Sequence, residues 1–201
     1  MADILYRYKD QVYANITNLC NCRCTFCIRF QKDGVGDADT LWHKVNPTKE
    51  QVLQAIKEYD FTRCEELVFC GYGEPTCALE ILLAAARYAK EEKGLKIRLN
   101  TNGLANAWHG RDIVPELSEV IDRVSISLNA PSAEKYDAVV KPQVADAFHR
   151  MCDFAVKCKE KIPYVRMTIV DVLEDEDIEA CKKLTNELGV TLYIRHFESN
   201  V

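Results

Sequence analysis

The chain lacks the features that would place it in a membrane, in a secretory pathway or on nucleic acid. No stretch approaches about 18 uninterrupted apolar residues, which excludes a transmembrane helix. The first ten residues, MADILYRYKD, are charged and contain no apolar segment, so we expect no secretory signal. The net charge of −5 argues against general nucleic-acid binding, which requires a basic surface. We therefore expect a cytoplasmic protein with neither a membrane nor a nucleic acid as its partner.

The chain also lacks a composition break, a Pro/Ser-rich linker and an internal repeat. Its 201 residues, 48% apolar and 28% charged, are typical of a globular protein. A chain of this length buries roughly 70% of the surface that its unfolded form exposes, so its core needs no disulfide bonds. These properties predict a single domain over residues 1–201.

Cysteine, by contrast, is abundant. Ten cysteines form an even set that would permit five disulfides, but disulfide-rich frameworks are typical of short secreted chains. Four of the ten fall within residues 20–27, and such crowding in a reducing compartment indicates a metal site. The ten positions are Cys20, Cys22, Cys24, Cys27, Cys64, Cys70, Cys77, Cys152, Cys158 and Cys181.

Short apolar runs alternate with helical patterns along the chain. The runs have the length and the β-branched or aromatic content of buried strands, and they cover residues 11–17, 66–70, 96–100, 123–128, 164–170 and 191–196. Apolar residues at helical spacing lie between them, after the capping pair Thr48 and Gln51 and in residues 79–89, 112–121, 145–160 and 174–188. This alternation predicts parallel βαβ units of an α/β fold, either a doubly wound sheet or a partial (β/α) barrel.

In both architectures the functional residues lie at the carboxyl ends of the strands. Unusual sequences follow the first four apolar runs, at residues 18–27, 71–76, 100–103 and 127–131. We therefore expect the chemistry of the protein at this edge of the sheet.

Cys20, Cys24 and Cys27 form a C-x3-C-x2-C pattern directly after the first run. A tight loop can direct three thiolates to an iron–sulfur cube, and three ligands leave one of four irons open. A fourth ligand with the ferredoxin spacing is absent. Two alternatives remain from spacing alone: a zinc site built from Cys24, Cys27 and two other cysteines, or reduced buried thiols.

The pattern, with Phe26 before the last cysteine, resembles the signature of the radical S-adenosylmethionine (radical SAM) superfamily. This resemblance implies a (β/α)6 partial TIM barrel in which Cys20, Cys24 and Cys27 hold a [4Fe–4S] cluster. The open iron would bind S-adenosylmethionine, which one electron cleaves to methionine and a 5′-deoxyadenosyl radical. Phe26 would pack near the adenine.

Further segments resemble the same superfamily. Gly73 and Glu74, in Gly71-Tyr72-Gly73-Glu74-Pro75, resemble the segment that contacts the methionine amino group. Ser127 and Asn129, together with Ser125, surround the expected ribose contact. The methionine carboxylate would be held by one of two cations, Arg166 or Lys141.

Longer segments, among them YANITNLC, CTFCIRF, VFCGYGEPT and VSISLNAPSAEKY, resemble the TatD-associated radical SAM proteins, short chains related to the activases of glycyl-radical enzymes. The expected function is radical SAM chemistry on an unknown substrate. Because the last predicted strand ends near the last residue, we expect an open barrel and a large substrate such as a protein. A glycyl-radical enzyme activase and a non-catalytic iron–sulfur or zinc module are the alternatives.

Basic residues surround the cysteine loop, at Arg23, Arg29 and Lys32. They predict either a docking site for an acidic one-electron donor such as flavodoxin or ferredoxin, or a solvated surface. We interpret Cys22 as a spectator inside the loop. Cys152, Cys158 and Cys181 are expected in the core, and Cys64 and Cys77 are not assigned.

Overall fold

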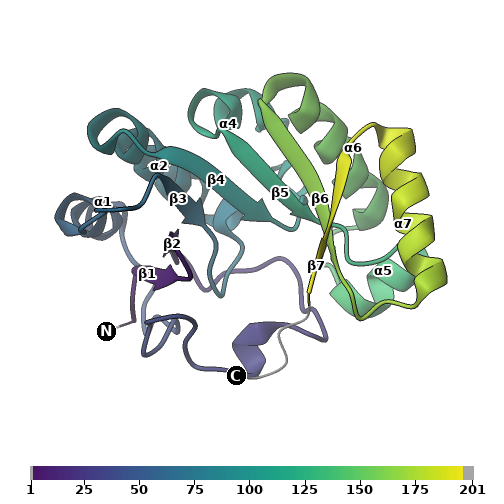
Figure 1. The fold of residues 1–201 in the computed structure, drawn as a ribbon, viewed down its shortest axis with the longest axis horizontal. Coiled ribbons are helices and arrows are strands. Elements are labelled where there is room, and N and C mark those ends of the chain that lie inside the picture. The colour runs from purple at the N-terminus through teal and green to yellow at the C-terminus, as the bar shows by residue number, and fades with distance from the viewer. Residues whose placement is uncertain (1, 197–201) are drawn as a thin grey trace.

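The apolar runs of the sequence form one sheet in the computed structural model, which describes residues 2–196 (Figure 1). The sheet has seven strands in chain order: β1 (Leu5–Tyr8), β2 (Gln11–Ala14), β3 (Glu66–Phe69), β4 (Lys96–Thr101), β5 (Arg123–Ser127), β6 (Tyr164–Val170) and β7 (Thr191–Arg195). Strands β2 to β7 are parallel, and β1 pairs antiparallel with β2 at the edge. The order never reverses, so the doubly wound alternative is wrong.

Two details of the strand prediction need correction. The expected first strand, residues 11–17, ends at Ala14, because Asn15 turns out of the sheet to bond other loops. The prediction also omits β1, which forms a hairpin with β2 and is stabilised by stacking of the Tyr6 and Tyr13 rings, 5.3 Å apart. Residues 1 and 197–201 of the predicted domain lie outside the described residues.

The helices connect the strands in the expected alternation. They are α1 (Lys49–Glu58), α2 (Leu79–Lys93), α3 (Ala105–His109), α4 (Val114–Val120), α5 (Ala133–Val140), α6 (Ala147–Lys161) and α7 (Asp175–Leu188), with the short 3-10 turns η1 (Ile28–Phe30) and η2 (Pro75–Ala78). The capping pair Thr48 and Gln51 is confirmed as a reciprocal box at the start of α1. Helices α3 and α5 are absent from the sequence prediction.

The helices pack on one face of the sheet and leave the other face for function. Figure 1 shows α2, α4, α6 and α7 along the outer side, while the long connection from β2 to α1 runs along the opposite side. Alternate strand residues such as Leu67, Leu99 and Ile126 are fully buried in a core beneath the helices. Cys152, Cys158 and Cys181 lie in this core, as expected. We call the face opposite the helices the inner face.

A second, smaller core secures the connection between β2 and α1. Tyr6, Leu41 and Tyr72 are buried together, and Trp42 packs edge-on against Tyr72 at 5.3 Å. This cluster fixes residues 31–48 beside the carboxyl ends of β2 and β3.

None of the helices in residues 2–196 has the length and hydropathy of a membrane-spanning segment. All ten cysteines are free thiols, so the fold uses no disulfide bond.

Candidate cofactor site at the carboxyl ends of the strands

The three predicted ligand cysteines come together in one loop directly after β2. Cys20, Cys24 and Cys27 are each partly exposed. Burial, and after it the charges of Cys27 and Cys20, raise the pKa of Cys24 to about 12. Three thiols that repel one another's charges need a positive group between them before all three can ionise.

The number of thiols on the loop indicates the kind of group that it could hold. Within residues 2–196, no group of three or more Cys, His, Asp or Glu side chains is arranged to hold a single metal ion. A cubane with an iron at each of four corners takes one thiolate per corner, and Cys20, Cys24 and Cys27 are the residues that could hold it through three of them.

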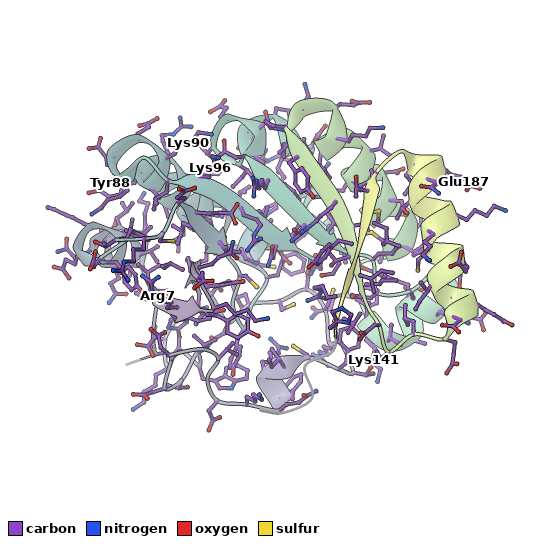
Figure 2. All side chains as sticks on the ribbon, viewed as in Figure 1. Arg7, Tyr88, Lys90, Lys96, Lys141 and Glu187 are labelled. Atoms are coloured by element: carbon purple, nitrogen blue, oxygen red, sulfur yellow. The ribbon has the colours of Figure 1, made fainter. Side chains whose placement is uncertain are left out.

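The segment at the end of α5 pairs with the cysteine loop through backbone hydrogen bonds. Residues 139–143 pair with it: Arg23 N donates to the carbonyls of Val140 and Lys141, at 3.1 and 3.2 Å, and Thr25 N donates to Val139 O at 2.9 Å. Cys22 forms an isolated bridge with Pro142 in the same pairing. Lys141 lies beside the loop in Figure 2, in a left-handed conformation with φ 47°. The cysteine loop is thus tied to an element more than a hundred residues later.

Cys22 differs from its three neighbours because it is 2% exposed. Its Sγ lies 3.4 Å from Asn102 Nδ2, and its hydrogen bond to Cys20 lowers the pKa of Cys20. Cys22 therefore supports the loop from inside and does not join the partly exposed trio.

The turn after β3 packs directly against the backbone of the cysteine loop. A Cβ atom on Gly73 would lie 2.3 Å from Thr17 O and 2.6 Å from Leu19 O, so only glycine fits there. The next residue fixes the contact, since Glu74 N donates to Leu19 O at 2.7 Å. This close approach explains why glycine stands immediately before Glu74.

The Glu74 carboxylate joins the turn after β3 to the end of β4. Its Oε1 accepts hydrogen bonds from Thr76 N, Thr76 Oγ1 and Thr101 Oγ1, and its Oε2 accepts from Asn102 N at 2.8 Å. Burial raises the pKa of Glu74, and these donors oppose the shift. The carboxylate of Glu74 therefore orders the segments that follow β3 and β4. Any contact between this segment and a cofactor comes from its backbone and from neighbouring residues.

Asn102 continues this network to the cysteine loop. Its Nδ2 donates to Asn21 Oδ1 at 2.6 Å, while its Oδ1 accepts from Leu104 N. The chain Glu74, Asn102, Asn21 thus links the turn after β3, the turn after β4 and the loop that carries the thiols. In the sequence, residues 100–103 stand out only as one of the unusual segments after the apolar runs, and Asn21 is not identified.

We expect Asn102→Ala to weaken retention of the cluster, because it removes the hydrogen bonds that join Asn21 and Cys22 to the turn after β4. A lost hydrogen bond to a buried partner costs about 1–3 kcal/mol. Iron content after anaerobic reconstitution and desalting, measured against time, should fall faster than in the wild-type protein. Asn106→Ala, which removes bonds to Asp112 and Ile113 away from the loop, is the matched control. Equal iron loss in both variants would contradict this role.

A further asparagine, Asn15, holds the start of the cysteine loop. Its Nδ2 donates to Leu41 O at 2.8 Å, its Oδ1 accepts from Tyr72 N, and His43 Nε2 lies 2.9 Å from Asn15 O. Burial lowers the pKa of His43, which favours the neutral ring. Nothing in the sequence indicates this function, because Asn15 falls inside the apolar run 11–17 that is predicted to be the first strand.

The other residues predicted to contact the cofactor lie either at the carboxyl ends of the strands or within a strand. Phe26 is 41% exposed on the cysteine loop, and Ser127 ends β5. Asn129 follows with φ 62° and a buried Oδ1 that has no hydrogen-bond partner in the described structure. Arg166 lies lower, in the middle of β6, where its Nε donates to Ser125 Oγ at 2.8 Å. The structure thus places Phe26, Ser127 and Asn129 at the strand ends and Arg166 on the inner face.

Arg29 differs from the solvated surface residue that one interpretation expects. Its guanidinium lies over the rings of Phe30 and Trp42, at 4.8 and 5.8 Å, and its Nη1 donates to Asn18 O and Tyr72 O. Arg29 therefore braces the cysteine loop against the turn after β3.

Comparisons with known proteins agree with this arrangement. The profile of the Radical SAM superfamily matches residues 14–185. A Methanocaldococcus jannaschii protein, provisionally named as a glycyl-radical enzyme activating enzyme, is 29% identical over 191 residues, or 89% of this chain and 70% of that protein. A GTP 3′,8-cyclase of Clostridium perfringens is 26% identical over 187 residues, covering 92% of this chain and 54% of the cyclase.

The fold has solved counterparts as well. The crystal structure of Streptococcus suis SuiB bound to S-adenosylmethionine superposes with a TM-score of 0.64 at 17% identity, covering 93% of this chain and 38% of SuiB. The chain therefore spans about half of the cyclase and less of SuiB. Because the superfamily profile covers most of the chain, including the cysteine loop, this protein belongs to the radical SAM superfamily of enzymes, whose members use a [4Fe–4S] cluster and S-adenosylmethionine.

Proposed function

We propose that Cys20, Cys24 and Cys27 bind three irons of a [4Fe–4S] cluster and that the chain cleaves S-adenosylmethionine reductively. The carrying observation is the trio of partly exposed thiols that one loop presents at the carboxyl ends of the strands. When bound, the cluster supplies the electron that breaks the C5′–S bond of S-adenosylmethionine, which yields methionine and a 5′-deoxyadenosyl radical that takes hydrogen from the substrate. The residues of the chain bind and orient the participants.

The cosubstrate would lie between the cysteine loop and the ends of β3 to β6. Phe26 would cover the adenine, Gly73 and Glu74 would form the wall near the methionine amino group, and Ser127 and Asn129 would face the ribose. The unpartnered Oδ1 of Asn129 supports this assignment, because a hydroxyl could satisfy it. The methionine carboxylate would be held by Arg166 on the inner face or by Lys141 in the segment that pairs with the cysteine loop.

We further propose that the sheet is a (β/α)6 partial barrel and that residues 1–201 form one radical SAM core domain. The unbroken order of the parallel strands supports the barrel. The free cysteines fit a reducing, cytoplasmic setting. Membership of the TatD-associated subgroup remains a proposal supported by the sequence segments.

The substrate class follows from the related activating enzyme by analogy. The relative from M. jannaschii supports a protein substrate that receives a glycyl radical, and we infer that a one-electron donor such as flavodoxin or ferredoxin supplies the electron. Exposed Phe30 and Ile28, 65% and 43% accessible, lie beside the thiols where such a donor would approach.

The test is anaerobic reconstitution with iron and sulfide, reduction with dithionite, and chromatography after addition of S-adenosylmethionine. Methionine and 5′-deoxyadenosine should form in equal amounts from the reduced protein and not from the oxidised one. A reconstituted, reduced protein that leaves S-adenosylmethionine intact would favour the non-catalytic iron–sulfur module instead.

A further inference from the structure

Buried hydrogen-bond donors without a partner gather around the cysteine loop. Within residues 2–196, the buried side-chain donor atoms that lack an acceptor are Asn21 Nδ2, Arg29 Nε, Arg98 Nε and Tyr136 Oη. Arg98 Nε lies 3.4 Å from the Glu66 carboxylate, which balances its charge. The other three belong to the cysteine loop or to α5, the helix whose end pairs with that loop. Because buried donors normally have acceptors, their gathering indicates an acceptor-rich group beside the loop.

Tyr136 is the one of these three donors that approaches the loop from another element. Its side chain is fully buried, and it lies one helical turn before Val139 and Val140. Val139 O accepts hydrogen bonds from Thr25 N at 2.9 Å and from Thr25 Oγ1 at 3.4 Å. Val140 O accepts from Arg23 N at 3.1 Å. The end of α5 is therefore bonded to the loop on both sides of its middle ligand thiol.

The thiols nearest this end of α5 are Cys22 and Cys24. Cys22 shares the buried core with the Tyr136 ring, and Cys24 packs against that core. Burial raises the pKa of Tyr136, and the charges of Cys22 and then Cys24 add to the shift, in agreement with this packing. Cys22 already has a partner, since Asn102 Nδ2 donates to its Sγ at 3.4 Å. Cys24 is the proposed cluster ligand of the two, and ligation to iron makes its sulfur a thiolate, which is a strong acceptor.

We propose that the Tyr136 hydroxyl donates a hydrogen bond to the Cys24 thiolate of the assembled cluster and thereby raises the reduction potential of the cluster. Hydrogen bonds to the sulfurs of an iron–sulfur cluster set its potential, and they favour the reduced form because it carries more negative charge. Tyr136 acts through Cys24 and is therefore a positioning residue. This deepens the proposed function, on which it rests, because it identifies a group that controls how readily the cluster accepts the electron.

The test compares Tyr136→Phe with the wild-type protein in two states. In the cluster-free protein, the substitution removes a hydroxyl that has no partner within residues 2–196, so the midpoint of thermal unfolding should stay the same or rise. In the reconstituted protein, a redox titration followed by electron paramagnetic resonance should give a more negative midpoint potential. At a fixed potential, the ratio of reduced to oxidised cluster should fall about threefold or more, as for a lost hydrogen bond to a charged acceptor.

Tyr88→Phe is the matched control. It removes the same hydroxyl from α2, which Figure 2 shows on the far side of the molecule from Lys141 at the end of α5. Its cluster should have the potential of the wild-type protein. A second variant, with 3-fluorotyrosine in place of Tyr136, keeps the ring and the hydroxyl. Because its hydroxyl is more acidic and donates more strongly, the potential should shift upward.

Two results would overturn the proposal. An unchanged or raised potential in Tyr136→Phe would show that the hydroxyl does not stabilise the reduced cluster. A loss of thermal stability in the cluster-free variant would show that the hydroxyl has another partner. The titration needs an assembled cluster but no cleavage of S-adenosylmethionine, so its failure is distinct from a wild-type protein that forms no 5′-deoxyadenosine. A wild-type protein that assembles no four-iron cluster would contradict the proposed function and this proposal together.

Discussion

Replacing Cys24 by alanine is expected to reduce formation of 5′-deoxyadenosine to the background of the protein-free reaction. Cys24 lies between Cys20 and Cys27 in the loop, and the charges of both thiols contribute to its raised pKa. Two thiolates cannot fix a cubane in one orientation, so the iron that binds the cosubstrate loses its position. The measurement combines iron and sulfide content, the absorbance of the reconstituted protein and product chromatography.

Cys22→Ala is the matched control, because Cys22 belongs to the same loop but is buried and bonded inward. It should keep the cluster and form product, with a modest loss of thermal stability from one lost side-chain contact. If Cys22→Ala loses iron as completely as Cys24→Ala, the assignment of three ligands to Cys20, Cys24 and Cys27 is wrong.

Gly73→Ala is expected to be the most damaging substitution outside the cysteines. The added methyl would overlap the carbonyls of Thr17 and Leu19, which are backbone atoms and cannot rotate away. Separating the turn from the cysteine loop also breaks the hydrogen bond from Glu74 N to Leu19 O. We expect a loss of about 3 kcal/mol or more in the free energy of unfolding, together with loss of cluster binding.

Gly110→Ala separates this steric effect from the general cost of removing a glycine. Gly110 has φ 64°, but nothing lies within 4 Å of its Cβ position. Its substitution should cost about 1–2 kcal/mol through backbone strain alone and leave the cluster bound. Thermal unfolding and iron content of both variants test the difference, and an equal loss of iron in the two would contradict the role of the close approach.

The sequence predicted the strands of the parallel sheet well, because each is a short apolar run between helical patterns. Residues 164–170 match β6 at both ends. The hairpin strand β1 escaped prediction because it is only four residues long, contains Arg7 and depends on tyrosine stacking with its partner. The short helix α5 escaped because its one clear cap, Ser132, lacks the acidic residue of a capping box.

The cysteine trio was predictable because its members are close in sequence and one spacing carries the chemistry. The supports of the trio were not. Asn102 reaches Asn21 across 81 residues, and Arg23 bonds to Val140 across more than a hundred. Such contacts depend on which strand ends become neighbours, and neither composition nor periodicity encodes the pairing of two polar loops.

Mössbauer spectroscopy of the protein reconstituted with 57Fe tests the central assignment most directly. In the oxidised cluster, addition of S-adenosylmethionine should change the signal of one iron in four and leave the other three unaltered, as expected for three thiolate ligands and one open site. Four irons that respond alike, or a spectrum that does not change with S-adenosylmethionine, would contradict the account.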